Sequence, residues 1–268
     1  SANAALCRMT GYTEPELRDH TAKILQSIFS SELSLQDMET ALQEQGHWQT
    51  DIIERRNDGA LLPLQFAINS VNNNDGVISH YVAIISDITK RKAEEAQLRH
   101  IAHHDPLTGL PNRVLFNDRM DQIFKRARRL QGKFAVVYLD LNDFKPVNDC
   151  FGHDTGDKLL QTVAARLIEN VRGTDTVTRL GGDEFVMLLE DISDRDMVDS
   201  IVEKTVTSVQ APCRINDHDI AIEVSVGVAL FPDDGTTART LMHHADLAMY
   251  AMKKRKKDRL SDTSAADR

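Results

Sequence analysis

The chain has 268 residues, of which 41% are hydrophobic and 27% charged, so it is long enough to form two folded domains. This composition excludes the fibrous and disordered classes, and the formal net charge of −9 argues against non-specific nucleic-acid binding as the main activity. A local cationic site for a nucleotide phosphate is still compatible with the acidic balance, and phosphate chemistry would then require a metal cation.

No apolar run approaches the length of a membrane span, so no membrane contact is expected for these residues. The chain begins with Ser1, which leaves open a longer parent protein that is linked to a membrane or has further domains. Cys7, Cys150 and Cys213 show neither metal-ligand spacing nor the even number that disulfides need, so reduced thiols in the cytosol are expected.

The N-terminal part is predicted to form one unit, with short helices early and strands later. Its three strands are expected at 47–55, 61–71 and 78–88. Asn57-Asp58-Gly59 is a turn signal between the first two, so the strands are expected to follow one another as an antiparallel meander. Pro63 lacks a backbone donor, which favours an edge strand or the start of a strand.

Short motifs in this unit resemble a PAS sensory domain in their order. They are Cys7 to Tyr12, Gly46 to Trp48, Arg56 to Gly59 and Asp87 to Thr89. Members of that family usually have two strands before the position of Cys7, and only Ser1 to Leu6 precede it here. The resemblance therefore implies a PAS domain that is N-terminally incomplete, and it assigns no ligand to this unit.

Residues 90–103 are helix-forming, with Leu98, Ile101 and Ala102 close to one stripe. We interpret this segment as a linker helix. Two alternatives stay open for the stripe: a short parallel coiled coil with a second chain, or a solvated connector that docks on its own domain.

The second unit begins with a turn-rich stretch from His104, in which Asn112 is the expected N-cap of a helix that runs to about Leu130. The apolar strand from Phe134 to Leu141 then carries one acid, Asp140, near its end. A carboxylate in that position is partly desolvated, and this cost is usually offset by hydrogen bonds, a cation or a metal.

A β-hairpin is predicted further along the chain, with its turn at Gly181 and Gly182 and two acids, Asp183 and Glu184, at its tip. Helices with apolar stripes flank it, and a long strand is expected over 218–231. Glycines at the turn let a bulky anionic ligand approach the main chain closely. Alone, this motif would indicate an ordinary turn with solvated acids.

Four segments in this unit are similar, in order and spacing, to the GGDEF family of diguanylate cyclases. They are Asp140 to Lys145, Gly152 to Asp157, Gly181 to Phe185 and Ala245 to Lys253. The resemblance implies an α/β fold of the α+β type, in which helices flank a nucleotidyl-cyclase-like central sheet. It also implies a bacterial cytoplasmic enzyme that condenses two GTP into cyclic di-GMP with release of two pyrophosphates.

The resemblance also assigns the metal site. Asp140, the main-chain carbonyl of Leu141, Asp183 and Glu184 would hold Mg²⁺, with Mn²⁺ as an alternative. Asp183 and Glu184 would be the catalytic acids, and which of them takes the proton of the attacking hydroxyl stays open.

Substrate contacts follow from the same resemblance. Asn148 and Asp157 would hydrogen-bond guanine, and His153 would line the substrate between them. The residues that would approach the phosphates are Phe144, Lys145, Lys253 and Lys257. Where the family has Gly, a basic residue and Asn beyond Lys253, this chain continues with a run of basic residues, so the geometry around Lys257 departs from the family.

Arg172 and Asp175 lie in the register of the family's inhibitory site for cyclic di-GMP, which implies product inhibition. The family mechanism also implies a homodimer, because each domain holds one GTP. The predicted organisation is a PAS-like domain at 1–89, a linker helix at 90–103, a cyclase domain at 104–258 and a disordered tail at 259–268. Two rivals are a catalytically silent module that binds GTP or cyclic di-GMP, and the cyclase part of a bifunctional protein.

Overall fold

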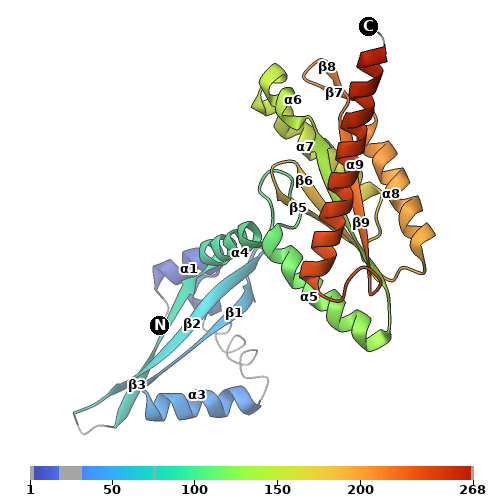
Figure 1. The fold of residues 1–268 in the computed structure, drawn as a ribbon. Coiled ribbons are helices and arrows are strands. Elements are labelled where there is room, and N and C mark those ends of the chain that lie inside the picture. The colour runs from blue at the N-terminus through green and yellow to red at the C-terminus, as the bar shows by residue number, and fades with distance from the viewer. Residues whose placement is uncertain (1–2, 18–31, 75–76, 267–268) are drawn as a thin grey trace. The chain divides into compact units, whose positions relative to one another are not determined.

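The computed structural model describes residues 3–17, 32–74 and 77–266, apart from the side chains of 32–35 and 256–266. The chain divides into two compact units, Ser1–Leu98 and Arg99–Arg268, and most of their helices and strands are labelled in Figure 1. Within the described residues, none of the helices combines the length and the apolar character that a membrane span requires.

The N-terminal unit is a meander beside short helices. Its elements are α1 (Ala4–Thr10), α3 (Glu32–Glu44), β1 (His47–Arg55), β2 (Leu61–Asn72) and β3 (Ile78–Asp87). The strands pair antiparallel in the order β1-β2-β3, which confirms the predicted meander. Pro63 lies near the start of the central strand β2, one residue before pairing with β3 begins at Leu64, so its missing N–H interrupts no ladder between those strands.

Local signals set the helix boundaries in this unit. The Asn3 side chain accepts a hydrogen bond from the Leu6 N–H and caps α1, and Gly11 ends the helix with a left-handed φ of 78°. A small core cluster of Leu42, Phe66 and Ile68 lies between α3 and the sheet.

The helix α4 (Thr89–His103) covers the predicted linker. It has no buried residue, and Leu98 and Ile101 are 67% and 51% exposed. Pairs such as Lys90 with Glu94, at a spacing of four residues, support the helix on its polar side. The apolar stripe is solvent-exposed within the described residues, and the coiled coil stays a prediction.

The C-terminal unit is built on a four-stranded antiparallel sheet in the order β5-β6-β4-β9. Its elements are α5 (Arg113–Leu130), β4 (Phe134–Asn142), α6 (Phe144–Phe151), α7 (His153–Glu169), β5 (Thr176–Gly181), β6 (Glu184–Leu189), α8 (Arg195–Gln210), β7 (Cys213–Ile215), β8 (His218–Ile220), β9 (Glu223–Phe231) and α9 (Ala238–Ala266). The predicted cap of α5 is confirmed, because the Asn112 side chain accepts from two N–H groups of the first turn.

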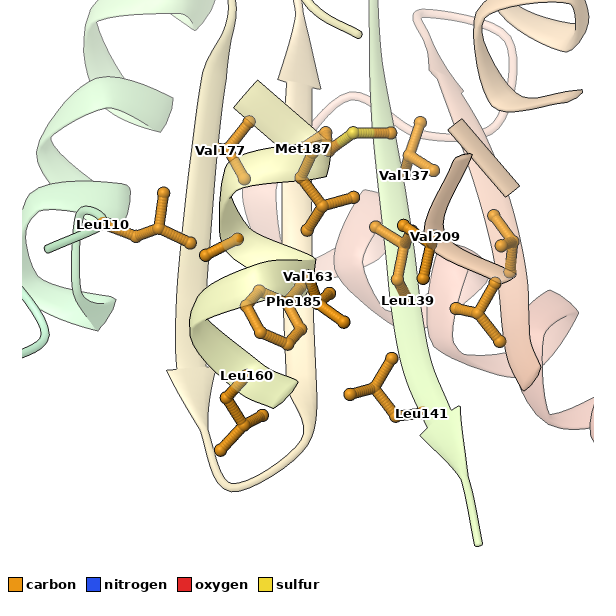
Figure 2. Close-up of a cluster of buried hydrophobic side chains, with 14 of the residues drawn as sticks. Leu110, Val137, Leu139, Leu141, Leu160, Val163, Val177, Phe185, Met187 and Val209 are labelled. Carbon is orange, nitrogen blue, oxygen red and sulfur yellow. The ribbon is translucent and has the colours of Figure 1, made fainter. Parts of the chain in front are cut away.

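Helices cover both faces of this sheet, as the alternation of side chains along its strands requires. On one face, Leu139 of β4 and Phe185 of β6 pack with Leu160 and Val163 of α7 (Figure 2). On the other, alternate residues of the same strands pack against α5 and α9. The α/β fold of the α+β type, with a helix-flanked sheet, is thus confirmed.

Three local expectations differ from the structure. The segment after Asn142 had no predicted element and forms α6, because Phe144 and Val147 pack on the core cluster and Pro146 falls in the first turn, where proline is tolerated. The strand expected over 218–231 is split at 221–222, where the chain changes partner from β7 to β4. The backbone of α9 is helical to Ala266, where a disordered tail was expected, since no glycine or proline ends the helix.

Candidate active site

Two carboxylates meet at the ends of the central strands. Asp140 of β4 is the direct antiparallel partner of Glu184 of β6, so both side chains leave the sheet on the same face. That face is the one covered by α5 and α9, because Val136 and Tyr138 alternate with Asp140 and belong to its cluster. The Asp140 side chain is 13% exposed, so its charge is largely withdrawn from water.

The hairpin turn between β5 and β6 is fastened from two sides. Gly181 and Gly182 have φ values of 146° and 54°, which suit glycine, and they make the turn predicted from the sequence. The Arg179 guanidinium donates to the Gly182 carbonyl from two nitrogens, at 3.0 and 2.8 Å. On the other side, the Leu141 N–H donates to the Asp183 carbonyl at 3.3 Å. The backbone of Asp183 is therefore fixed beside the end of β4.

Arg179 extends this support to the start of the unit. Its guanidinium forms an ion pair of 2.9 Å with Asp105, and the two side chains are 11% and 18% exposed. Burial opposes ionisation of Asp105, but hydrogen bonds from Thr108 and Arg179 outweigh it and lower the pKa of Asp105. The segment that follows α4 is thereby tied to the acidic turn by a charged, largely buried contact. The sequence did not indicate this contact, because the two partners are 74 residues apart.

Lys253 of α9 contacts the carboxylate of Asp140 directly. α9 reaches the sheet closely at Gly227 of β9, where an added Cβ would lie 1.9 Å from the carbonyl oxygen of Ala245. The missing side chain therefore allows the helix to lie flat on the strand and brings Lys253 to the end of β4. This lysine was predicted to approach a phosphate, and the structure places it against the strand-end acid.

Tyr138 is a further residue at this site. Burial, together with the charge of Glu184 and a hydrogen bond with it, raises the pKa of Tyr138. Tyr138 is therefore a third side chain that interacts with the acidic pair at this edge of the sheet. The sequence carried a signal for it, because a tyrosine two positions before Asp140 must share its face of the strand.

The donors at this edge fit a hard cation with few protein ligands. Within the described residues, no three side chains of His, Cys, Asp or Glu form a group able to hold a metal ion. Mg²⁺ usually takes one or two carboxylates and keeps several waters. Asp140 and Glu184, paired across two strands and beside the main chain of Leu141 and Asp183, match that requirement.

The corner between α6 and α7 carries the predicted guanine contacts. A Cβ on Gly156 of α7 would lie 1.9 Å from Oδ1 of Asn148 in α6, so the glycine allows the Asn148 amide to pack on the backbone of α7. Asp157 follows directly and is exposed, as is His153 at the start of α7. Gly152, with φ of 84°, makes the bend between the helices. Asn148 and the backbone next to Asp157 are thereby brought together.

The predicted phosphate contacts are distributed unevenly. Lys145 is exposed on α6, whereas the Phe144 side chain is half-buried and packs against the core cluster. The side chain of Lys257 lies outside the described residues.

The pair predicted to bind inhibitor lies away from the strand ends, in the loop before β5. The Asp175 carboxylate accepts from the backbone N–H groups of Arg172 and Glu190, at 2.9 and 3.0 Å, so it stabilises the loop. Arg172 and Asp175 line an open hollow of about 330 Å³ together with Arg119 of α5. The sequence did not single out Arg119, which adds a second cation to the hollow.

Comparisons with known proteins give matches for both units of the chain. The family model described as diguanylate cyclase, GGDEF domain, matches residues 102–259, and a PAS domain model matches residues 1–90. The chain is 47% identical over 157 residues to the bifunctional diguanylate cyclase/cyclic di-GMP phosphodiesterase MucR of Pseudomonas aeruginosa, a match that covers 59% of this chain and 23% of MucR. The chain therefore spans less than a quarter of that relative.

Solved structures give the same result for the C-terminal unit. The GGDEF domain of TpbB from Pseudomonas aeruginosa is 38% identical with a TM-score of 0.56, over 57% of this chain and 90% of that one. The coiled coil and GGDEF domain of DgcB from Caulobacter crescentus, solved in complex with cyclic di-GMP, is 28% identical with a TM-score of 0.56, over 62% of this chain and 88% of that one.

Proposed function

Because the chain belongs to the GGDEF family of diguanylate cyclases, we propose that it condenses two molecules of GTP into cyclic di-GMP and two pyrophosphates. The observation that carries the proposal is the cross-strand pair of Asp140 and Glu184 beside a hairpin turn held by Arg179. A site on strand ends of a sheet covered on both faces is rigid enough to position phosphates for in-line attack.

In the proposed reaction, the ribose 3′-hydroxyl of each GTP attacks the α-phosphorus of the other. Each new phosphodiester bond releases one pyrophosphate, and the proton of the hydroxyl passes to a base. Asp183 and Glu184 are the candidates for that base, and the Tyr138 phenol interacts with Glu184. Mg²⁺ held by Asp140, Glu184, Asp183 and the Leu141 carbonyl would neutralise charge on the phosphates.

The chain's other residues bind and orient the substrate in this proposal. Asn148 and Asp157 recognise guanine at the corner of α6 and α7, with His153 beside them. Lys145 and Lys253 would contact the phosphates, and for Lys253 this requires its ammonium to leave the carboxylate of Asp140 that it contacts in the structure. The C-terminal unit of each chain holds one GTP in this proposal. Two chains must therefore bring their C-terminal units face to face, so a homodimer is part of the mechanism.

Cyclic di-GMP synthesis by the purified chain tests this proposal. Incubation with GTP and Mg²⁺ should yield cyclic di-GMP and pyrophosphate in a ratio of one to two. Asp183→Ala should abolish the product, whereas Asp199→Ala, in an exposed pair on α8, should leave synthesis unchanged. A chain that binds GTP and makes no cyclic di-GMP would be a silent binding module, and the proposed reaction would be wrong.

We further propose that product binds the hollow lined by Arg119, Arg172 and Asp175 and inhibits synthesis. Two guanidinium groups suit the phosphates and guanine edges of cyclic di-GMP. Arg172→Ala should raise the inhibition constant for cyclic di-GMP, and Arg214→Ala, outside the hollow, should not. An unchanged inhibition constant in Arg172→Ala contradicts the assignment.

Regulation by the N-terminal unit is part of the same proposal. A PAS domain joined through α4 would raise the effective concentration of one catalytic unit near the other. Removal of residues 1–89 should then change dimerisation or specific activity, and the idea is wrong if both stay the same.

A further inference from the structure

The β7–β8 hairpin contacts the corner proposed to bind guanine, and the proposed mechanism gives it no role. Asn216 and Asp217 join the strands, and their φ values of 48° and 66° are those of a tight two-residue turn. Ile215 and Ile220 on either side are 6% and 4% exposed and belong to the core cluster. The hairpin is therefore anchored at its base and presents its turn from a fixed position.

The side chain of Asn216 makes two hydrogen bonds to the first turns of α7. Its amide nitrogen donates to the Thr155 hydroxyl at 3.2 Å, and its amide oxygen accepts from the Lys158 ammonium. Thr155 is 3% exposed, so its hydroxyl needs a partner within the protein. The two contacts lie on either side of Asp157, the residue proposed to accept hydrogen bonds from guanine.

The same hairpin also contacts α6. The ring of His218, at the start of β8, lies 4.9 Å from the ring of Phe151, the last residue of α6. The helices α6 and α7 are joined at Gly152, a residue whose backbone is intrinsically permissive. The hairpin thus contacts both helices on either side of the bend that connects them.

We propose that the β7–β8 hairpin braces α6 against α7, so that Asn216 is a positioning residue that sets the spacing of the guanine contacts Asn148 and Asp157. This inference rests on the proposed function, because it assigns a role at the same site. Guanine differs from hypoxanthine by its 2-amino group, which Asp157 must meet at hydrogen-bond distance. A small displacement of α7 lengthens that hydrogen bond, and losing it lowers the affinity for guanine.

The test compares two glycine substitutions in one turn. Asn216→Gly removes the contacts with α7, whereas Asp217→Gly removes only an exposed pair with Arg214. Glycine adopts a positive φ without strain, so both variants keep the turn. The dissociation constants of GTP and of inosine triphosphate, which lacks the 2-amino group, are measured by calorimetry with Ca²⁺ as the cation. The Michaelis constant and kcat are measured with Mg²⁺.

Asn216→Gly is expected to weaken GTP binding about five- to tenfold, the value of one hydrogen bond, and inosine triphosphate binding by less than about twofold. The Michaelis constant for GTP should rise by a similar factor, with kcat at saturation nearly unchanged. Asp217→Gly should change neither nucleotide's affinity. Equal weakening of both nucleotides in Asn216→Gly, or affinities equal to those of Asp217→Gly, overturns the inference.

The affinity measurements test the role of the hairpin separately from the proposed synthesis of cyclic di-GMP. If the unmodified chain discriminates the two nucleotides and Asn216→Gly does not, the brace holds even where no cyclic di-GMP is formed. If the unmodified chain forms cyclic di-GMP and Asn216→Gly retains full discrimination, the brace alone is wrong.

Discussion

Both units contain an antiparallel sheet, but the two sheets differ in how much of their surface is buried. In the C-terminal unit, β4 is buried along nearly its whole length, because helices cover both faces of the sheet. In the N-terminal unit, β2 has one buried face, and β3 is exposed along most of its length within the described residues. Its described core cluster contains only Leu42, Phe66 and Ile68 as buried members. Within the described residues, fewer apolar side chains are therefore buried on the N-terminal sheet than on the C-terminal one.

The difference in packing suits the two units to different roles: a rigid C-terminal unit can position catalytic groups, and a less packed N-terminal unit can respond to a signal. Catalytic carboxylates must be held within fractions of an ångström, and the strand ends of a sheet packed on both faces provide that rigidity. A unit with a small core opens at lower free energy, and elements that respond to signals are drawn from such regions. We therefore expect the N-terminal unit to unfold first and the C-terminal unit to set the global stability.

The largest effect is expected from matched phenylalanine truncations. Phe185 of β6 is fully buried and Phe66 of β2 is 2% exposed. Replacing either residue by alanine therefore removes the same buried aromatic ring. Phe185→Ala should cost about 4 kcal/mol, and Phe66→Ala about 3 kcal/mol or less, because the thinner layer around Phe66 can collapse into the cavity. Urea denaturation followed by far-UV circular dichroism measures both. A larger loss in Phe66→Ala would contradict the comparison.

The next effect concerns the ion pair that fastens the acidic turn. Arg179→Ala leaves Asp105 largely buried without its cation and removes two hydrogen bonds to the Gly182 carbonyl. Because both side chains keep some exposure, we expect a loss of about 2–3 kcal/mol in unfolding free energy, somewhat less than for a fully buried pair. Cyclic di-GMP synthesis should fall with it, since the backbone of Asp183 loses its support.

A matched arginine provides the control for this substitution. Arg195 pairs with Asp199 on the surface of α8, with both side chains more than half exposed. Arg195→Ala should change the unfolding free energy by less than about 0.5 kcal/mol. If both variants cost the same, the buried pair contributes nothing specific to the turn.

A smaller effect is expected when the pH is lowered, and the unfolding free energies of the two units should depend on pH to different degrees. Hydrogen bonds from Thr108 and Arg179 overcome the burial of Asp105 and lower its pKa, whereas a hydrogen bond from Lys92 lowers the pKa of the exposed Asp51. A depressed folded-state pKa contributes stability that is present above the unfolded value near 4 and is lost as pH falls through the folded value.

Unfolding free energies measured from pH 7 down to pH 3 test this expectation. In Asp105→Asn, the unfolding free energy of the C-terminal unit should fall less steeply with decreasing pH (a flatter acid limb of the curve), because the side chain no longer titrates. Asp51→Asn should change the acid limb of the N-terminal unit much less, since solvent screens an exposed pair. An acid limb that is unchanged in Asp105→Asn would show that this carboxylate does not control it.

Local patterns predicted much of the fold and only part of the site. The Gly181-Gly182 turn, the Asn112 cap and the three-stranded meander follow from short-range rules and are confirmed. Contacts between distant residues could not be predicted in the same way, because no periodicity links Lys253 to Asp140 across 113 residues. The family resemblance placed both residues at one site, but it did not indicate that they contact each other.

The smallest effect on stability is expected at α4, where the comparison between the units reaches its limit. Leu98 is 67% exposed, so Leu98→Gln removes no described packing and should change the unfolding free energy of either unit by less than about 0.5 kcal/mol. If α4 pairs with a second copy, the same change should weaken dimerisation in sedimentation equilibrium and lower specific activity at low protein concentration. Gln97→Ala, the neighbouring position, should alter neither. A loss of stability without a loss of dimer would instead mean that Leu98 packs on its own chain, and the linker would then transmit a signal through docking rather than through a coiled coil.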